Sequence, residues 1–108
     1  MSKRHILVVD DEPEIRGLVQ EILEDEGFTV DAAENASKAR ELIATHTPNL
    51  ILLDIWMPDV DGITLLKEWK NFFKDEVPII MMSGHGNVET AVEATRGGAY
   101  DFIEKPLS

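Results

Sequence analysis

Three short, unbroken apolar segments constrain the fold of this chain more than any other feature. They cover residues 6–9, 50–53 and 79–82, a length typical of single strands and far below that of a membrane span. Apolar residues at every position indicate strands that are covered on both faces, as in parallel sheets. Residues 28–32 and 100–104 mix polar residues into a strand-like pattern, so we expect them at the edges of the same sheet.

Amphipathic helical patterns separate these segments. Apolar residues recur at intervals of three and four positions in four stretches of the chain. Pro13 suits the first position of the first helix, Gly27 suits its end, and Asn35 suits the N-cap of the second. The third helix is expected after Gly62 and the fourth before Gly97. The order βαβαβαβαβ predicts one α/β domain built on a parallel sheet.

The division into edge and central segments narrows the topology. With the first, third and fourth strands in the centre, the simplest order with short connections is 2-1-3-4-5, a doubly wound five-stranded sheet. Right-handed crossovers then place the first helix on one face and the second, third and fourth helices on the other. Because one face is short of cover, we expect a fifth helix that is missing or truncated in this chain, or a partner that replaces it.

Composition excludes several classes of function. The 108 residues include 10 Lys and Arg against 21 Asp and Glu, and the resulting charge of −11 repels nucleic acid and anionic membranes. The absence of cysteine excludes disulfides and thiolate metal sites. No signal-peptide-like segment is present, which predicts a cytoplasmic protein. Basic partners and metal ions are compatible with this charge.

Polar residues gather where the predicted strands end, and ligands of open α/β sheets bind outside those carboxyl ends. The residues are Asp10, Asp11 and Glu12 after the first strand, Asp54 after the third, Ser83 after the fourth and Lys105 after the fifth. Carboxylates this close repel one another unless a cation compensates them, and oxygen ligands with open positions favour Mg²⁺. Taken singly, Asp11 or Glu12 is equally typical of a helix cap. Only the joint occurrence indicates a site.

These motifs occur together in a known family. The segments that carry the resemblance are Val8-Val9-Asp10-Asp11-Glu12, Leu53-Asp54-Ile55-Trp56-Met57-Pro58 with Asp61-Gly62, Met82-Ser83-Gly84, Gly98-Ala99-Tyr100-Asp101-Phe102 and Glu104-Lys105-Pro106. In this order they resemble the receiver domain of two-component response regulators, most of all the NtrC/NtrX nitrogen-regulation type. The resemblance implies a flavodoxin/CheY-like fold and a receiver domain over residues 1–108 that ends before its usual fifth helix.

The resemblance also implies a mechanism. Asp54 is the expected phosphoacceptor, which receives a phosphoryl group from the phosphohistidine of a sensor histidine kinase. Asp11, Asp54 and the backbone carbonyl of Trp56 are the expected ligands of Mg²⁺, with Asp10 acting through a metal-bound water. Lys105 is expected to contact the Asp54 carboxylate at rest and a phosphoryl oxygen afterwards.

Further residues are implied as parts of a switch. Ser83 is expected to donate a hydrogen bond to the phosphoryl oxygen, and Phe102 to signal by burial of its ring. Trp56 and His85 occupy positions that influence the lifetime of the phosphoryl group, and Trp56 is expected to slow hydrolysis. The structural alternatives are an ordinary edge-strand aromatic for Phe102 and a cover for the crevice rim for Trp56.

The resemblance finally implies partners and output. The domain is expected to be a phosphorylation-activated switch, and not a turnover enzyme, that controls a C-terminal output domain in transcription. Pairing through the fourth helix and fifth strand is expected for a homodimer, with no direct binding of nucleic acid or membrane by this domain. The Lys105–Pro106 peptide bond is expected to be cis, which aims the lysine inward.

Three other functions fit the residues less well. A haloacid-dehalogenase-like phosphatase requires the spacing D-x-D at its nucleophile, but the residue two positions after Asp54 is Trp56. A flavodoxin-like FMN carrier brings a phosphate against the acidic cluster after the first strand without a loop that binds anions. A receiver fold kept only for protein interaction is expected to lose Asp54 or Lys105, and both are present.

Overall fold

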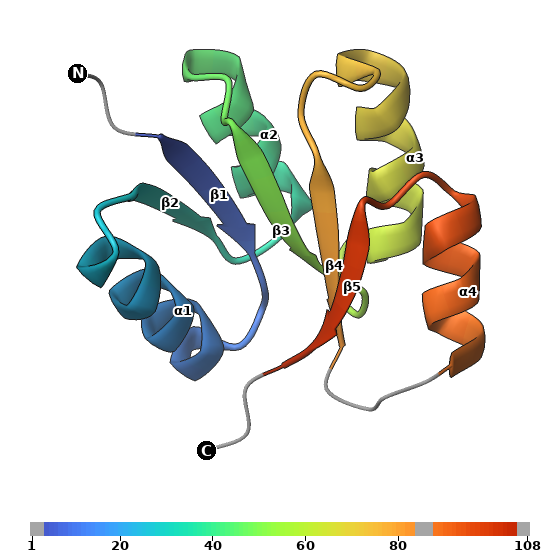
Figure 1. The fold of residues 1–108 in the computed structure, drawn as a ribbon, viewed down its shortest axis with the longest axis horizontal. Coiled ribbons are helices and arrows are strands. Elements are labelled where there is room, and N and C mark those ends of the chain that lie inside the picture. Colours follow the sequence, from blue (N-terminus) through green and yellow to red (C-terminus); the bar gives the residue numbers. More distant parts are fainter. Residues whose placement is uncertain (1–3, 84–87, 106–108) are drawn as a thin grey trace.

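A five-stranded parallel sheet forms the centre of the molecule in the computed structural model, which describes residues 4–83 and 88–105. Its strands are β1 (His5–Val9), β2 (Thr29–Ala33), β3 (Leu50–Asp54), β4 (Ile79–Ser83) and β5 (Asp101–Glu104). They are arranged in the order β2-β1-β3-β4-β5, and every pair is parallel (Figure 1). The predicted strand order is therefore confirmed.

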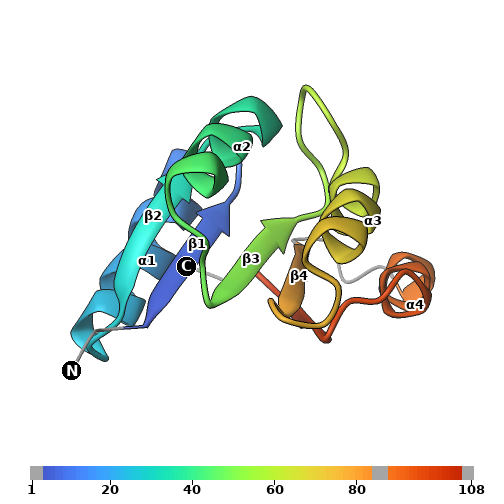
Figure 2. The same cartoon turned by 90° about the horizontal axis from the view of Figure 1, so that it is seen from above.

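The helices cover the two faces of the sheet unequally. They are α1 (Pro13–Asp25), α2 (Ala36–Thr45), α3 (Gly62–Phe73) and α4 (Val88–Arg96). Figures 1 and 2 show α1 on one face and α2, α3 and α4 on the other, as the right-handed crossovers predict. Among the described residues, no helix is both long enough and apolar enough to cross a membrane.

The helix ends follow the predicted signals. Pro13 lies in the first turn of α1, where its missing N–H costs no hydrogen bond. Gly27 adopts a φ of 94°, which side chains disfavour, and its N–H donates to the carbonyl of Glu24 at 3.0 Å. The Asn35 side chain accepts a hydrogen bond from the N–H of Lys38 at 2.8 Å, so it is the N-cap of α2.

Two edge-strand boundaries differ from the prediction. The strand expected at residues 28–32 begins at Thr29, because the N–H of Phe28 closes the end of α1 by donating to the carbonyl of Leu23 at 3.1 Å. The strand expected at residues 100–104 begins at Asp101, and Tyr100 before it is exposed. Neither difference changes the order of the sheet.

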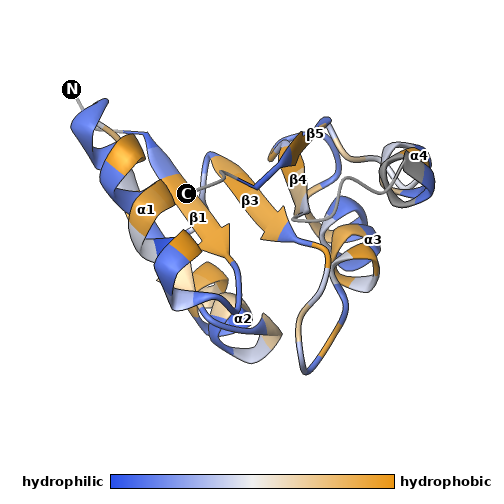
Figure 3. Ribbon diagram, turned by 90° about the horizontal axis from the view of Figure 1, so that it is seen from below, coloured by the Kyte–Doolittle hydropathy of each residue, from blue (hydrophilic) through white to orange (hydrophobic). Residues whose placement is uncertain are grey.

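The core lies on both faces of the central strands. Along β1, Ile6 and Val8 pack on the side of α1, whereas Leu7 and Val9 pack on the side of α2, α3 and α4. Figure 3 shows that hydrophobic residues concentrate in β3, β4 and much of β1. Each fully buried aliphatic side chain contributes about 1.5–3 kcal/mol of hydrophobic free energy, so these strands hold the register of the sheet.

The face that carries α1 retains exposed apolar side chains. Leu18 and Ile22 on α1 are exposed, and so is Ile103 on β5. Ile103 pairs in register with Met82, whose side chain belongs to the cluster on the α1 side. The described helices therefore leave the β5 end of this face without apolar cover.

Candidate functional site

Buried polar side chains meet at the carboxyl edge of the sheet. Asp10 directly follows β1, Asp54 ends β3, Ser83 ends β4, and Lys105 directly follows β5. Their exposed fractions are 0%, 1%, 0% and 7%. The N–H of Lys105 donates to the carbonyl of Ser83 at 2.9 Å, which continues the sheet ladder by one residue. Four groups predicted from separate strand ends thus lie at one edge of the sheet.

Lys105 is the centre of this arrangement. Its Nζ lies 3.1 Å from Oδ2 of Asp10 and 3.3 Å from Oδ1 of Asp54, and it also donates to the carboxylate of Glu12. Asp10 is itself held in place, because its Oδ1 accepts from the N–H of Glu12 at 2.9 Å and its carbonyl accepts from Arg16 at 2.8 Å. One ammonium is therefore shared by three carboxylates.

Burial dominates the electrostatics of the site. The pKa of the Asp54 carboxyl is raised from 3.8 to about 7, mainly by burial and further by repulsion from Asp10, although Lys105 opposes the rise. Burial also raises the pKa of Asp10, against hydrogen bonds from Glu12 and Lys105. For Lys105, burial lowers the pKa, but hydrogen bonds to Glu12 and Asp10 outweigh it, so the pKa is raised. The lysine is therefore fully charged, and the site still carries excess negative charge.

The residues fit a hard divalent cation. Oδ2 of Asp10 and both carboxylate oxygens of Asp54 are buried and accept no hydrogen bond within the described part of the chain, although Lys105 lies at ion-pair distance. Carboxylate oxygens of Asp10, Asp11 and Glu12 also lie within 4.8 Å of one another. Oxygen-only donors with unused lone pairs and one compensating lysine suit Mg²⁺.

Asp11 and Asp54, both predicted as metal ligands, do not fall into one close group. Asp54 lies outside the set of oxygens that share the 4.8 Å spacing. Asp11 is exposed, and none of the described residues holds its side chain by a hydrogen bond. Asp11 is nevertheless near enough to Asp54 for its charge to contribute to the raised pKa of the Asp54 carboxyl.

The remaining predicted residues lie around this edge or outside the description. Trp56 follows β3 and is 58% exposed, and Phe102 on β5 is half-buried against the core on the α2, α3 and α4 side. His85 and Pro106 lie outside the described residues, and so does the predicted cis bond between Lys105 and Pro106.

Gly62 supports the site in a way that sequence analysis did not identify. A Cβ atom at this position would lie 2.1 Å from the carbonyl oxygen of Asp54 and 2.8 Å from Cα of Ile55. The N–H of Gly62 donates to the carbonyl of Ile55 at 2.7 Å. Only glycine permits the start of α3 to approach the end of β3 this closely. The sequence signal was the Asp61-Gly62 pair, which indicated a helix start and belonged to the family motif but did not predict this close approach.

Asp59 is a second residue that sequence analysis missed. Its carboxylate accepts from the backbone N–H groups of Ala36 and Ser37, each at 3.2 Å, and so reaches the first turn of α2. Burial alone raises the pKa of Asp59, but hydrogen bonds from Ala36, Val60 and Ser37 outweigh it, so the pKa lies below 3.8. The loop between β3 and α3 is thereby tied to α2 by a contact across 23 positions.

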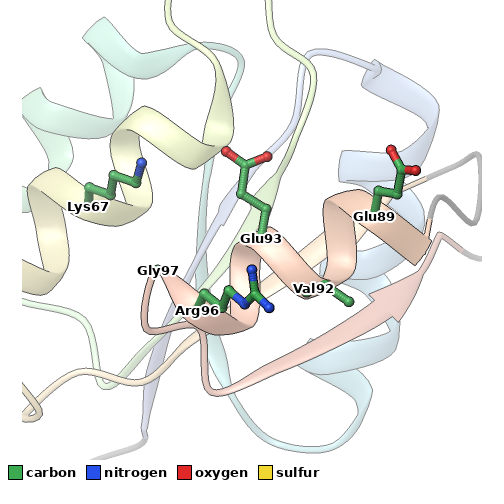
Figure 4. A pocket seen from close by; sticks show the side chains of 6 residues that line it. All are labelled: Lys67, Glu89, Val92, Glu93, Arg96 and Gly97. Atoms are coloured by element: carbon green, nitrogen blue, oxygen red, sulfur yellow. The ribbon is translucent and has the colours of Figure 1, made fainter.

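A separate groove lies between α3 and α4 (Figure 4). It has a volume of about 510 Å³, and its charged lining consists of Lys67 on α3 with Glu89, Glu93 and Arg96 on α4. No ion pair joins Lys67 to Glu93 among the residues described. Two acids and two bases give the groove no concentration of one charge, unlike the edge around Asp54.

Comparisons with known proteins match nearly the whole chain. The response regulator receiver domain matches residues 6–108. The nitrogen assimilation regulatory protein NtrX of Azorhizobium caulinodans is 55% identical over 105 residues, which are 95% of this chain and 23% of that protein. The crystal structure of the receiver domain of NtrX from Brucella abortus has a TM-score of 0.88 at 51% identity, and the match covers 95% of this chain and 87% of that one.

A third relative was solved in an activated state. The solution structure of the beryllofluoride-activated NtrC4 receiver domain dimer has a TM-score of 0.87 at 42% identity and covers 96% of this chain and 85% of that one. The chain spans only part of the length of its curated relatives, 23% for the NtrX protein of Azorhizobium caulinodans.

Proposed function

Because this chain belongs to the response regulator receiver domain family, we propose that it is a phosphorylation-activated switch whose phosphoacceptor is Asp54. The observation that supports this most is the state of the Asp54 carboxylate. It is almost fully buried, its oxygens accept no hydrogen bond from the described residues, and the Lys105 ammonium lies 3.3 Å away. A carboxylate oxygen held beside one ammonium, with no hydrogen bond from the backbone of the described residues, can act as a nucleophile.

The proposed step is phosphoryl transfer from a sensor histidine kinase. An oxygen of Asp54 forms a bond to phosphorus while the bond from phosphorus to the histidine nitrogen breaks, and the electron pair stays on the imidazole. Lys105 moves its contact from the carboxylate to a phosphoryl oxygen. Asp54 must be ionised to attack, and its pKa is about 7 even with Lys105 beside it, so a bound cation would favour the ionised form further.

Magnesium has a defined place in this proposal. We propose that Asp11, Asp54 and the backbone carbonyl of Trp56 bind Mg²⁺ directly, and Asp10 through a water. When bound, Mg²⁺ supplies positive charge that neutralises the carboxylates and the transferred phosphoryl oxygens. The unpartnered oxygens of Asp10 and Asp54 support this assignment.

The conformational change on phosphorylation is proposed to begin at Ser83 and to end at the partly exposed ring of Phe102. Ser83 ends β4 next to Asp54, since the N–H of Ile55 donates to the carbonyl of Met82 at 3.1 Å. Its hydroxyl is proposed to donate to the phosphoryl oxygen and to draw in the segment that follows, which includes His85 outside the described residues. The half-buried ring of Phe102, which has no hydroxyl, then responds only by becoming more or less buried.

Trp56 is proposed to lengthen the lifetime of the phosphoryl group. Its large ring is exposed two residues after Asp54 and lines a cavity of about 300 Å³ with Ile55 and Lys67. Trp56→Asn is expected to speed dephosphorylation because water then reaches the site more easily. An unchanged rate in the variant contradicts this assignment and leaves the role of Asp54 intact.

The domain is proposed to act within a longer cytoplasmic regulator of transcription, of the nitrogen-regulation type. Exposed Leu18, Ile22 and Ile103 on the α1 face support a fifth helix that packs there beyond the described residues. A longer chain that includes this helix is expected to melt at a clearly higher temperature. Pairing through α4 and β5 is proposed for the homodimer, since the related NtrC4 receiver is a dimer when activated.

A small phosphodonor tests the central assignment. The protein is incubated with acetyl phosphate, with and without Mg²⁺, and its intact mass is measured. We expect a gain of one phosphoryl group only with Mg²⁺, and none in Asp54→Asn. Asp25→Asn, a substitution at an exposed site on α1, is the control and should be modified like the wild type. Modification of Asp54→Asn, or none of the wild type, contradicts the proposal. Repeated turnover of a phosphomonoester instead supports a phosphatase.

A further inference from the structure

Glu12 occupies the N-cap position of α1, but its side chain does not cap the helix. Its backbone is extended, with φ −87° and ψ 111°, and its side chain accepts no hydrogen bond from the first turn. The carboxylate instead lies against the ammonium of Lys105, 93 positions away in the sequence. The charge of Glu12 therefore stabilises the Lys105 ammonium at the carboxyl edge of the sheet and does not stabilise the end of α1.

The three carboxylates around Lys105 differ in their freedom to leave it. The side chains of Asp10 and Asp54 are 0% and 1% exposed, whereas that of Glu12 is 56% exposed. If Asp10 or Asp54 lost its contact with Lys105, a buried carboxylate would remain without a positive partner, which is energetically unfavourable. Glu12 can turn into water and be solvated there. Of these three carboxylates, that of Glu12 can lose its contact with the Lys105 ammonium at the lowest cost in free energy.

We propose that Glu12 is a releasable anchor for Lys105: it holds the ammonium while Asp54 is unmodified and gives it up when a phosphoryl-like anion is bound there. The inference rests on the proposed function of Asp54 and Lys105. Glu12 is a positioning residue, because it acts through Lys105 and contacts neither the anion nor the acceptor oxygen. Since the anion must take Lys105 from Glu12, the hold of Glu12 lowers the affinity of the site for that anion.

Beryllofluoride is the probe that tests this, because it mimics a phosphoryl group without transfer. Its dissociation constant is measured by calorimetry in saturating Mg²⁺ for the wild type, Glu12→Gln, Glu12→Asp and Glu14→Gln. The first variant removes the charge of Glu12. The second keeps the charge but shortens the side chain by one methylene, which draws the carboxylate back from Lys105 and weakens their contact. Glu14, exposed on the first turn of α1, is the control for lost charge without lost contact.

We expect Glu12→Gln and Glu12→Asp to bind beryllofluoride about three- to tenfold more tightly, the strength of a half-exposed charged hydrogen bond, and Glu14→Gln to change less than about twofold. A purely structural role for Glu12 would not tighten binding. The anchor is refuted if both Glu12 variants bind like the wild type or more weakly, or if only Glu12→Gln tightens, which indicates simple repulsion. If the wild type itself does not bind beryllofluoride with Mg²⁺, the proposed function fails instead.

Discussion

Replacing Asp54 with asparagine removes a carboxyl group that folding places almost entirely out of water. In the unfolded chain this group ionises near pH 3.8, but in the folded protein its pKa is about 7. Between these values the unfolded state loses its proton first, so a rise in pH destabilises the native state. The full penalty is reached above pH 7. Asparagine has nearly the same shape and does not ionise, so it avoids this cost.

The magnitude follows from the two pKa values. A separation from 3.8 to about 7 corresponds, at 1.36 kcal/mol per pH unit, to about 4 kcal/mol in the free energy of unfolding. This is a large part of the roughly 5–15 kcal/mol that stabilises a typical domain. Relative to their difference at pH 4, Asp54→Asn is therefore expected to gain stability over the wild type steadily up to pH 7 and to gain no more above it.

Urea denaturation from pH 4 to pH 8 in the presence of EDTA measures this difference. Asp25→Asn, at an exposed site, should show no comparable pH dependence relative to the wild type. Saturating Mg²⁺ should shrink the advantage of Asp54→Asn at pH 8, because a bound cation offsets the buried charge. A difference between wild type and Asp54→Asn that does not vary with pH would show that the carboxyl is not desolvated, and the reasoning would be refuted.

Three further predictions concern stability and are checked by the same denaturation assay. Gly62→Ala should lower the free energy of unfolding by about 3 kcal/mol or more, because the added Cβ clashes with the backbone carbonyl of Asp54 and no side-chain rotation relieves the clash. A decrease below about 1 kcal/mol would contradict this. Asp59→Ala should lower the free energy of unfolding by about 1 kcal/mol at neutral pH, because the first turn of α2, which Asn35 caps, loses the hydrogen bonds that Ala36 and Ser37 donate to Asp59. The loss should fade below pH 3.8, as the native carboxylate with its lowered pKa also becomes protonated; a loss that is equally large at pH 2 would refute the charge argument. Lys74→Gly should stabilise by about 1 kcal/mol, because Lys74 has a φ of 58° and a ψ of −125°; destabilisation would show that its side chain matters more than its backbone strain.

Much of the fold was predictable because local patterns determine it. The apolar segments specify buried parallel strands, and proline, glycine and asparagine mark helix ends by their own backbone chemistry. The positions of Asp10, Asp54, Ser83 and Lys105 were predictable for a topological reason. Residues that end parallel strands meet at one edge whatever their separation in sequence.

The details of the site depended on contacts that no local pattern encodes. Three contacts join atoms from elements that only packing brings together. They are the close approach of Gly62 to Asp54, the hydrogen bonds from α2 to Asp59, and the ion pair between Glu12 and Lys105. Sequence by itself thus determined which elements form, in which order they pair and which strand ends carry charge. The tertiary structure alone decided which carboxylates lose water and which lysine contact can open, because desolvation and distance are properties of packed atoms and not of residue order.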